Sequence, residues 1–95
     1  MSVKVIVELK AKPGRRDELR SLIEQLATRE RPDGYHGSTY YASLDDPDLL
    51  IDVSDWESPD SRSAHLAKAM AAGAYDPVLE LLAGPFRAVV IRQLP

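Results

Sequence analysis

The stretch LLIDVSDWESPDSRSAH, from Leu49 to His65, decides the fold, because a strand gives way to a helix within it. Its first eight residues predict a strand, and alternation places Asp52 and Trp56 on the same face. The letters SPDS then predict a helix start, with Ser58 as the N-cap and the following proline at the first helical position. A strand that leads at once into a helix favours a mixed α and β fold.

The chain on both sides of this stretch also changes between strand and helix patterns. Odd-numbered apolar residues from Val3 to Leu9 predict a first strand, and apolar residues spaced three and four apart predict a helix before the RPDG break. The predicted elements are strand 3–10, helix 15–30, strand 35–44, strand 49–56, helix 60–72, a short helix between Asp76 and Gly84, and strand 85–94. This order predicts an α+β fold of the ferredoxin-like, split βαβ type, a four-stranded antiparallel sheet with helices on one face.

Length and composition narrow the class of protein. A chain of 95 residues that is 44% apolar is expected to form one domain over residues 1–95 and to bury a limited share of its surface. The first and last strands carry apolar residues on both faces, so we expect a homodimer that covers the open face of the sheet. A net charge of −3 argues against nucleic-acid binding, and no apolar run approaches the roughly 20 residues that cross a membrane. The N-terminus also lacks the apolar core of a signal peptide, which predicts a cytoplasmic protein.

Several kinds of site lack their sequence signature. The chain has no cysteine, and therefore no disulfide and no thiolate nucleophile. It shows neither a glycine-rich phosphate loop nor paired histidines at zinc spacing, so we expect no cofactor and no metal. The acidic DDPD at 45–48 predicts a turn, because proline presets the backbone and aspartate side chains bond to nearby amides.

Five short motifs, in their order and spacing, make the chain resemble the antibiotic biosynthesis monooxygenase family. The motifs are KPG at 12–14, RPDG at 31–34, DDPD at 45–48, WES at 56–58 with a histidine nine residues after the tryptophan, and LLAGP at 81–85. The resemblance implies a dimeric α+β barrel. Some members of the family oxidise polycyclic phenols such as anthrones with O₂ and no cofactor, and others degrade haem.

Three positions depart from the pattern of the active relatives. Asp52 stands about where the anthrone-oxidising members carry an amide side chain, and Ser54 stands where many relatives carry glutamate. The haem-degrading members use an asparagine on the first strand, and the comparable place here falls near Val7. The resemblance therefore argues against haem degradation, although His65 is left open as an iron ligand.

Asp52, Trp56 and His65 are the candidate catalytic residues. Asp52 shares a strand face with Trp56, whose flat indole suits stacking on an aromatic ligand or donating its N–H. His65 titrates near neutral pH and is a candidate acceptor of a phenolic proton. Each residue also has an ordinary structural role open to it: Asp52 facing solvent, Trp56 filling the space between sheet and helix, and His65 lying on the surface.

The candidate substrate-binding residues are mostly aromatic. They are Tyr35, Tyr41, Met70, Tyr75 and Phe86. Strict alternation along the second strand predicts that Tyr41 shares a face with Tyr35. Tyr75 and Phe86 flank the short helix and are expected at the rim of a pocket or in the dimer contact. Met70 is expected to pack in the core as well as near the ligand.

Two functions of different kinds fit these residues. The first is a cofactor-independent monooxygenase that oxidises a small aromatic or phenolic substrate, anthrone- or quinol-like, with O₂. His65 would then move the proton, Trp56 would stack, and Asp52 or a tyrosine would orient the ring. The second is a dimeric module that binds a small molecule or serves in a stress response without catalysis. Haem binding through His65 is a third hypothesis. Arg62 has no role in any of them and is expected to lie in solvent.

Overall fold

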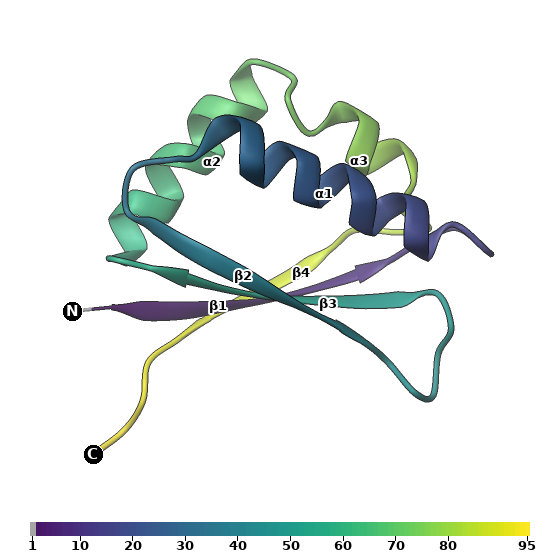
Figure 1. The fold of residues 1–95 in the computed structure, drawn as a ribbon, viewed down its shortest axis with the longest axis horizontal. Helices are drawn as coiled ribbons and strands as arrows, with labels where there is room; N and C mark the ends of the chain where they lie inside the picture. Colours follow the sequence, from purple (N-terminus) through teal and green to yellow (C-terminus); the bar gives the residue numbers. More distant parts are fainter. Residues whose placement is uncertain (1) are drawn as a thin grey trace.

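The computed structural model describes residues 2–95 and has two layers, a sheet and a set of helices (Figure 1). Its elements are β1 (Val3–Lys10), α1 (Arg16–Glu30), β2 (Tyr35–Ala42), β3 (Leu49–Trp56), α2 (Pro59–Ala71), α3 (Asp76–Glu80) and β4 (Arg87–Ile91). The strands form one antiparallel sheet in the order β2-β3-β1-β4, and the helices lie together on one of its faces. The predicted element order and the ferredoxin-like α+β class are confirmed.

β1 and β3 form the centre of the sheet and carry much of its core. Val5 and Leu9 on β1 are buried, and Leu50 and Trp56 on β3 point into the same layer, as the predicted alternation requires. Most of the buried apolar side chains fall into two clusters, one around Leu9 and Leu50, the other around Val5 and Trp56. Val7 packs against both clusters. The layer between sheet and helices therefore has two packed ends that meet over the middle of β1.

A β-bulge on β2 corrects the predicted alternation of that strand. Tyr35 pairs with Trp56, but Asp55, the residue before Trp56 on β3, pairs with Gly37. One extra residue is therefore inserted in β2. Gly37 has a φ of +123°, a conformation that side chains with a Cβ rarely adopt. Beyond the bulge, even-numbered residues such as Tyr40 share the face of Tyr35. Tyr41 instead points to the opposite face and is 53% exposed, so its predicted place beside Tyr35 is wrong.

α2 begins and ends where its local chemistry predicts. The Oγ of Ser58 accepts a hydrogen bond from the N–H of Ser61 at 3.1 Å, and Pro59 occupies the first turn. The helix stops just before Gly73, whose φ of +72° is the left-handed conformation common after helix ends. These ends fix how many turns α2 has, and therefore where its middle residues lie over the sheet.

The last two elements are shorter than predicted. α3 covers only Asp76–Glu80, and Tyr75 rather than Asp76 holds the position before its first turn. β4 covers Arg87–Ile91 instead of 85–94, because it lies at the edge of the sheet and pairs only with residues 4–8 of β1. Among residues 2–95, no helix is both long enough and apolar enough to cross a membrane.

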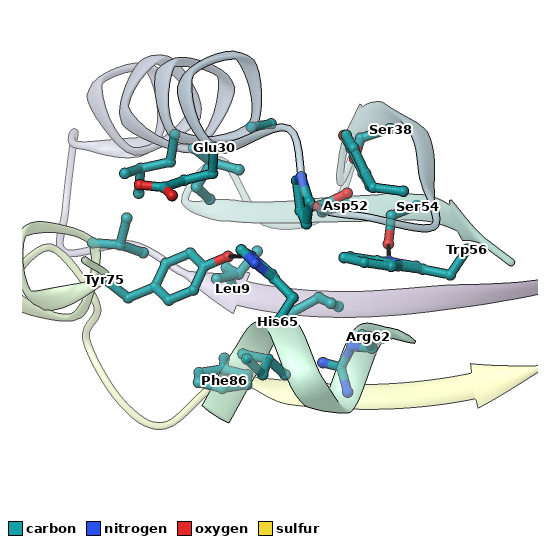
Figure 2. A pocket seen from close by; sticks show the side chains of 18 of the residues that line it. Leu9, Glu30, Ser38, Asp52, Ser54, Trp56, Arg62, His65, Tyr75 and Phe86 are labelled. Atoms are coloured by element: carbon teal, nitrogen blue, oxygen red, sulfur yellow. Dashed lines mark hydrogen bonds between the residues drawn. The ribbon is translucent and has the colours of Figure 1, made fainter. Parts of the chain in front are cut away.

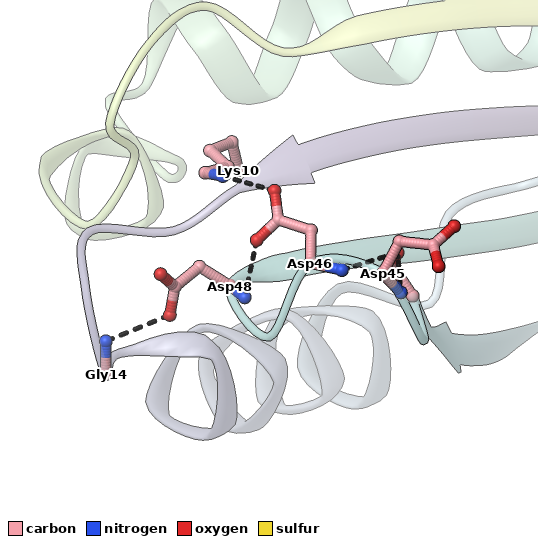
Figure 3. A network of polar contacts seen from close by, with 6 residues as sticks. Lys10, Gly14, Asp45, Asp46 and Asp48 are labelled. Carbon is pink, nitrogen blue, oxygen red and sulfur yellow. Dashed lines mark hydrogen bonds and ion pairs between the residues drawn. The ribbon is translucent and has the colours of Figure 1, made fainter.

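Two motifs that lie far apart in the sequence meet at one end of the sheet (Figure 3). Gly14, which ends KPG, donates its N–H to Asp48 Oδ1 at 3.0 Å, and Lys10 pairs with Asp46. The N–H of Asp48 donates to Asp46 Oδ1 at 2.9 Å, and the hydrogen bond from Lys10 lowers the pKa of the Asp46 carboxyl. The acidic DDPD is thus a turn that holds the β1–α1 connection, in agreement with the interpretation as a turn.

Candidate functional site

A cavity of about 120 Å³ lies between the sheet and the helices, where the two apolar clusters meet (Figure 2). Most of its lining is aliphatic or aromatic. The aromatic lining residues are Tyr35, Tyr40, Trp56, His65, Tyr75 and Phe86, and the ionisable acids and bases among the rest are Glu30, Asp52 and Arg62. An apolar chamber with a few convergent polar groups is the usual form of a small-molecule site.

Asp52 is the polar residue of the cavity whose hydrogen bonding is least complete. It rises from the middle of β3, and its Oδ1 is buried without a hydrogen-bond partner among residues 2–95. Burial raises the pKa of Asp52 to about 6, and the Ser38 hydroxyl and the positive charge of Arg62 offset only part of that rise. Because an unpaired buried oxygen is costly, the arrangement is typical of a site whose missing partner is a ligand.

Trp56 is a buried aromatic residue in the lining of the cavity. The side chain is only 5% exposed and its N–H donates to Ser54 Oγ at 2.9 Å. Its ring centroid lies 5.1 Å from that of Tyr35 and 5.7 Å from that of His65. The N–H is therefore used within the protein, and stacking is the contact that Trp56 still has to offer.

His65 reaches from α2 toward Tyr75, at the start of α3 (Figure 2). Its Nε2 lies 2.9 Å from the Tyr75 hydroxyl, and the two rings meet edge to face at 82°. Burial lowers the pKa of His65, so the imidazole is mainly neutral near pH 7. Burial, and secondarily the charge of Asp52, raises the pKa of Tyr75, so its hydroxyl keeps its proton. The pair can therefore hold one proton between a basic nitrogen and a phenol.

The bulged strand β2 supplies the side of the cavity next to Asp52. Tyr35 and Ser38 are joined by a hydrogen bond between their hydroxyls. Tyr40 lies opposite Asp52 in the β2–β3 ladder, and burial together with that neighbouring carboxylate raises the pKa of Tyr40 well above its ordinary value. Both tyrosine hydroxyls of this wall are thus protonated around neutral pH, and the wall carries no charge of its own.

Most of the candidate residues named from the sequence line this cavity. Tyr41 and Met70 lie elsewhere than predicted. Tyr35, Tyr75 and Phe86 line the cavity, whereas Tyr41 faces away from it. Met70 lines the cavity but is 45% exposed, so its predicted packing in the core is wrong. It stands on the turn of α2 after the buried Ala69, which places it at the rim rather than in the layer.

Four lining residues were missed or interpreted differently in the sequence. Ser38 and Tyr40 were missed because strict alternation ignored the bulge, although a glycine inside a strand pattern is a known signal for one. Arg62 was expected in solvent but lines the cavity half-buried, and its spacing of three residues from His65 predicts a shared helix face. Glu30 joins them because α1 ends above β2.

The described part of the chain shows no ready metal centre. Residues 2–95 contain no group of three or more histidine, cysteine, aspartate or glutamate side chains placed to hold an ion. His65, the residue left open as a haem ligand, has its Nε2 in the hydrogen bond with Tyr75. Iron could bind this nitrogen only after its hydrogen bond to Tyr75 had broken.

Comparisons with known proteins agree with this architecture. A protein of Bordetella bronchiseptica that carries the name of the antibiotic biosynthesis monooxygenases superposes with a TM-score of 0.86 at 22% identity, over 99% of this chain and 98% of that one. A protein of Mycobacterium tuberculosis superposes with a TM-score of 0.78 at 26% identity, over 100% and 97% of the two chains. A conserved protein of Methanosarcina mazei Go1 gives 0.82 at 18% identity, over 99% and 94%. No curated protein matches the sequence.

The family comparison is more specific than these shared folds. The family described as antibiotic biosynthesis monooxygenase matches residues 2–75, which include the motifs KPG, RPDG, DDPD and WES and the histidine of α2. That match covers well over half of the chain. The chain therefore belongs to the antibiotic biosynthesis monooxygenase family.

Proposed function

We propose that the protein is a cofactor-independent monooxygenase that oxidises a small aromatic or phenolic substrate, anthrone- or quinol-like, with O₂. Membership of the family supports the reaction class. The observation that carries the proposal is the buried, unpartnered Oδ1 of Asp52 in a chamber walled by aromatic rings. Such an oxygen can take the proton of a phenolic hydroxyl as the ring lies against Trp56.

The reaction needs only the substrate and O₂. Loss of the hydroxyl proton makes an electron-rich anion, which gives an electron to O₂ and then joins it through a new C–O bond. For a hydroquinone the sum is C₆H₆O₂ + O₂ → C₆H₄O₃ + H₂O, and for a reactive CH₂ carbon it is CH₂ + O₂ → C=O + H₂O. In the second sum both C–H bonds and the O–O bond break, while a carbonyl and two O–H bonds of water form. The substrate supplies all the electrons that reduce O₂, so the sum requires no further reductant.

The side chains divide the proton work between them. Asp52, with a pKa of about 6, is mostly ionised at neutral pH and still basic enough to accept a phenolic proton in the transition state. The neutral His65, joined to Tyr75 by a 2.9 Å hydrogen bond, relays a proton to the oxygen that leaves as water. Trp56 positions the ring, since its N–H is already bonded to Ser54.

We also propose that the working form is a homodimer. Ile6, Val53 and Val89 lie opposite one another in neighbouring strands, so they form an apolar row on the sheet face away from the helices. Val89 is 38% exposed among the described residues 2–95. A second copy that packs its own row there would bury both faces.

Oxygen consumption tests the proposal. We would compare wild type, Asp52→Asn, His65→Ala and the control Ser63→Ala, which alters an exposed position of α2. The substrates would be an anthrone and a hydroquinone, with no cofactor added. With at least one of the two substrates we expect uptake above the buffer rate, a fall of roughly 10²-fold in Asp52→Asn, a fall in His65→Ala, and no change in Ser63→Ala. Equal uptake in all four proteins, or none above buffer with either substrate, would overturn it.

One observation favours a second function, a binding module without catalysis. The Trp56 N–H and the His65 Nε2 are both bonded within the protein, which leaves few polar atoms free to act on a ligand. The same cavity would then hold a small aromatic molecule without changing it. Calorimetric binding of such a molecule, with no O₂ uptake and no product after prolonged incubation, is the result that supports this second function.

A further inference from the structure

We infer that, of the anthrone- and quinol-like substrates proposed above, the site takes only the single-ring, quinol-like ones, inserted with a phenolic hydroxyl toward Asp52 Oδ1, and that it rejects fused polycyclic ligands such as anthrones. The inference rests on the proposed function for the aromatic nature of the ligand. It adds the number of rings, the direction of insertion and the group that is recognised. It also singles out Asp52 as the residue that determines specificity.

The size of the chamber sets the number of rings. Its volume is about 120 Å³. An apolar cavity of about 150 Å³ is known to hold one benzene molecule. A fused three-ring compound needs about twice the space of one ring, and the lining side chains that would have to give way belong to packed layers, since Leu9 and Val78 are core residues. A single ring fits with little displacement.

The exposure of the lining sets the direction of insertion. The exposed lining residues belong to the helices: Glu30 ends α1, Met70 lies on α2 and Leu79 on α3. The Oδ1 of Asp52 is buried and comes from β3 in the sheet. A ligand therefore passes between the helices, and its leading group meets the carboxylate. A substituent on the opposite side of the ring remains near the mouth.

The surroundings of Asp52 set the chemistry of that leading group. The charged and titratable groups that line the cavity with it are Glu30 from α1, Tyr35 and Tyr40 from β2, Arg62 and His65 from α2, and Tyr75 before α3. Oδ1 is an acceptor in need of a donor, which excludes ethers and ketones as the leading group. A carboxylate would face the like charge of Asp52. An ammonium group would have to give up its hydration in a chamber lined mostly by apolar side chains, where Oδ1 offers one free acceptor for its three N–H donors, so a neutral hydroxyl is the donor that fits.

Anaerobic titration calorimetry with four matched ligands tests the inference. They are 4-methylphenol, 4-methylanisole, which lacks the donor, 4-methylbenzylamine, which carries a cation, and a three-ring anthrone. We expect 4-methylphenol to bind about ten- to a hundredfold more tightly than 4-methylanisole, as for a hydrogen bond to a charged group. We expect the amine and the anthrone to bind more weakly than 4-methylphenol.

Two variants separate recognition from folding. Asp52→Leu is expected to abolish the preference for 4-methylphenol over 4-methylanisole, while Asp52→Asn, which keeps an acceptor oxygen, is expected to retain part of it. Equal binding of phenol and anisole by wild type overturns the inference, as does tighter binding of the amine or the anthrone. Because O₂ is absent, a phenol preference in a protein that never consumes O₂ would overturn the proposed function and leave this inference standing.

Discussion

Replacing Asp52 by asparagine should make the protein more stable at neutral pH and have little such benefit in acid. The change removes a charge from a buried site and keeps the size of the side chain. In the folded protein the pKa of Asp52 is about 6, against an ordinary value of 3.8, and burial is the main cause. The folded state thus holds a proton that the unfolded chain has already released over this range of pH.

The sign and size of the effect follow from linkage. A carboxyl whose pKa is raised by folding contributes its full stability below the unfolded value of 3.8 and loses it as the pH rises through about 6. At about 1.4 kcal/mol for each pKa unit, the whole loss is about 3 kcal/mol. About 2 kcal/mol of it falls between about pH 4.5 and pH 8. The amide of the Asp52→Asn variant has no proton to lose, so the variant gains on wild type by this amount as the pH rises.

Urea unfolding of both proteins at several pH values measures the difference. Protein concentration must be the same throughout, because self-association would add a concentration-dependent stability. Any constant cost of placing an amide at this position cancels when one compares the difference at pH 8 with that at pH 4.5. Titration of other groups, His65 among them, occurs in both proteins and cancels largely in the same way. A carbon-detected NMR titration of the Asp52 carboxyl gives the pKa directly.

A flat difference would refute the reasoning. If the free energies of unfolding of the two proteins differ by the same amount, within about 0.5 kcal/mol, at every pH, then Asp52 is not desolvated as described. A difference that grows toward acid would mean that the carboxylate is stabilised by a cation in the folded state. A buried carboxylate that lowers stability at neutral pH is typical of a binding or catalytic site. The predicted direction is therefore consistent with a functional role for Asp52.

Three further predictions concern the fold and its assembly. Ser58→Ala should lower the free energy of unfolding by about 1 kcal/mol through loss of the α2 N-cap, while Ser63→Ala, tested by the same urea unfolding, should not lower it. Gly37→Ala should cost about 1–2 kcal/mol because its φ is +123°, whereas Gly84→Ala, which lacks a positive φ and meets no neighbour, should be nearly neutral; equal losses would contradict the bulge. Val89→Lys should convert the proposed dimer into monomers in analytical ultracentrifugation, and a wild type that is already monomeric on dilution to micromolar concentration would contradict the assembly.

The sequence predicted what depends on near neighbours along the chain. Alternation from Val3 to Leu9 and the spacing of apolar residues in α1 revealed their elements, because a strand repeats every two residues and a helix every three to four. The helix start at Ser58 and Pro59 was equally local, since capping joins groups only a few residues apart. The strand-to-helix stretch also placed Asp52 and Trp56 on one face correctly, because β3 is regular throughout.

The tertiary structure decided the properties that depend on atoms from several elements. One extra residue in β2 turned Tyr41 away and brought Tyr40 to Asp52, and no periodic pattern contains that insertion. The neighbours of His65 come from β3 and from the residue before α3, so its partner Tyr75 could not be read from spacing alone. The pKa of Asp52 is raised by burial, which exists only once β2 pairs beside β3 and the helices cover the sheet. Sequence therefore determined the elements and which faces are apolar, whereas the cavity, its size and its unpaired carboxylate oxygen arise from packing, because solvation and hydrogen bonding are set by whatever the folded chain brings into contact.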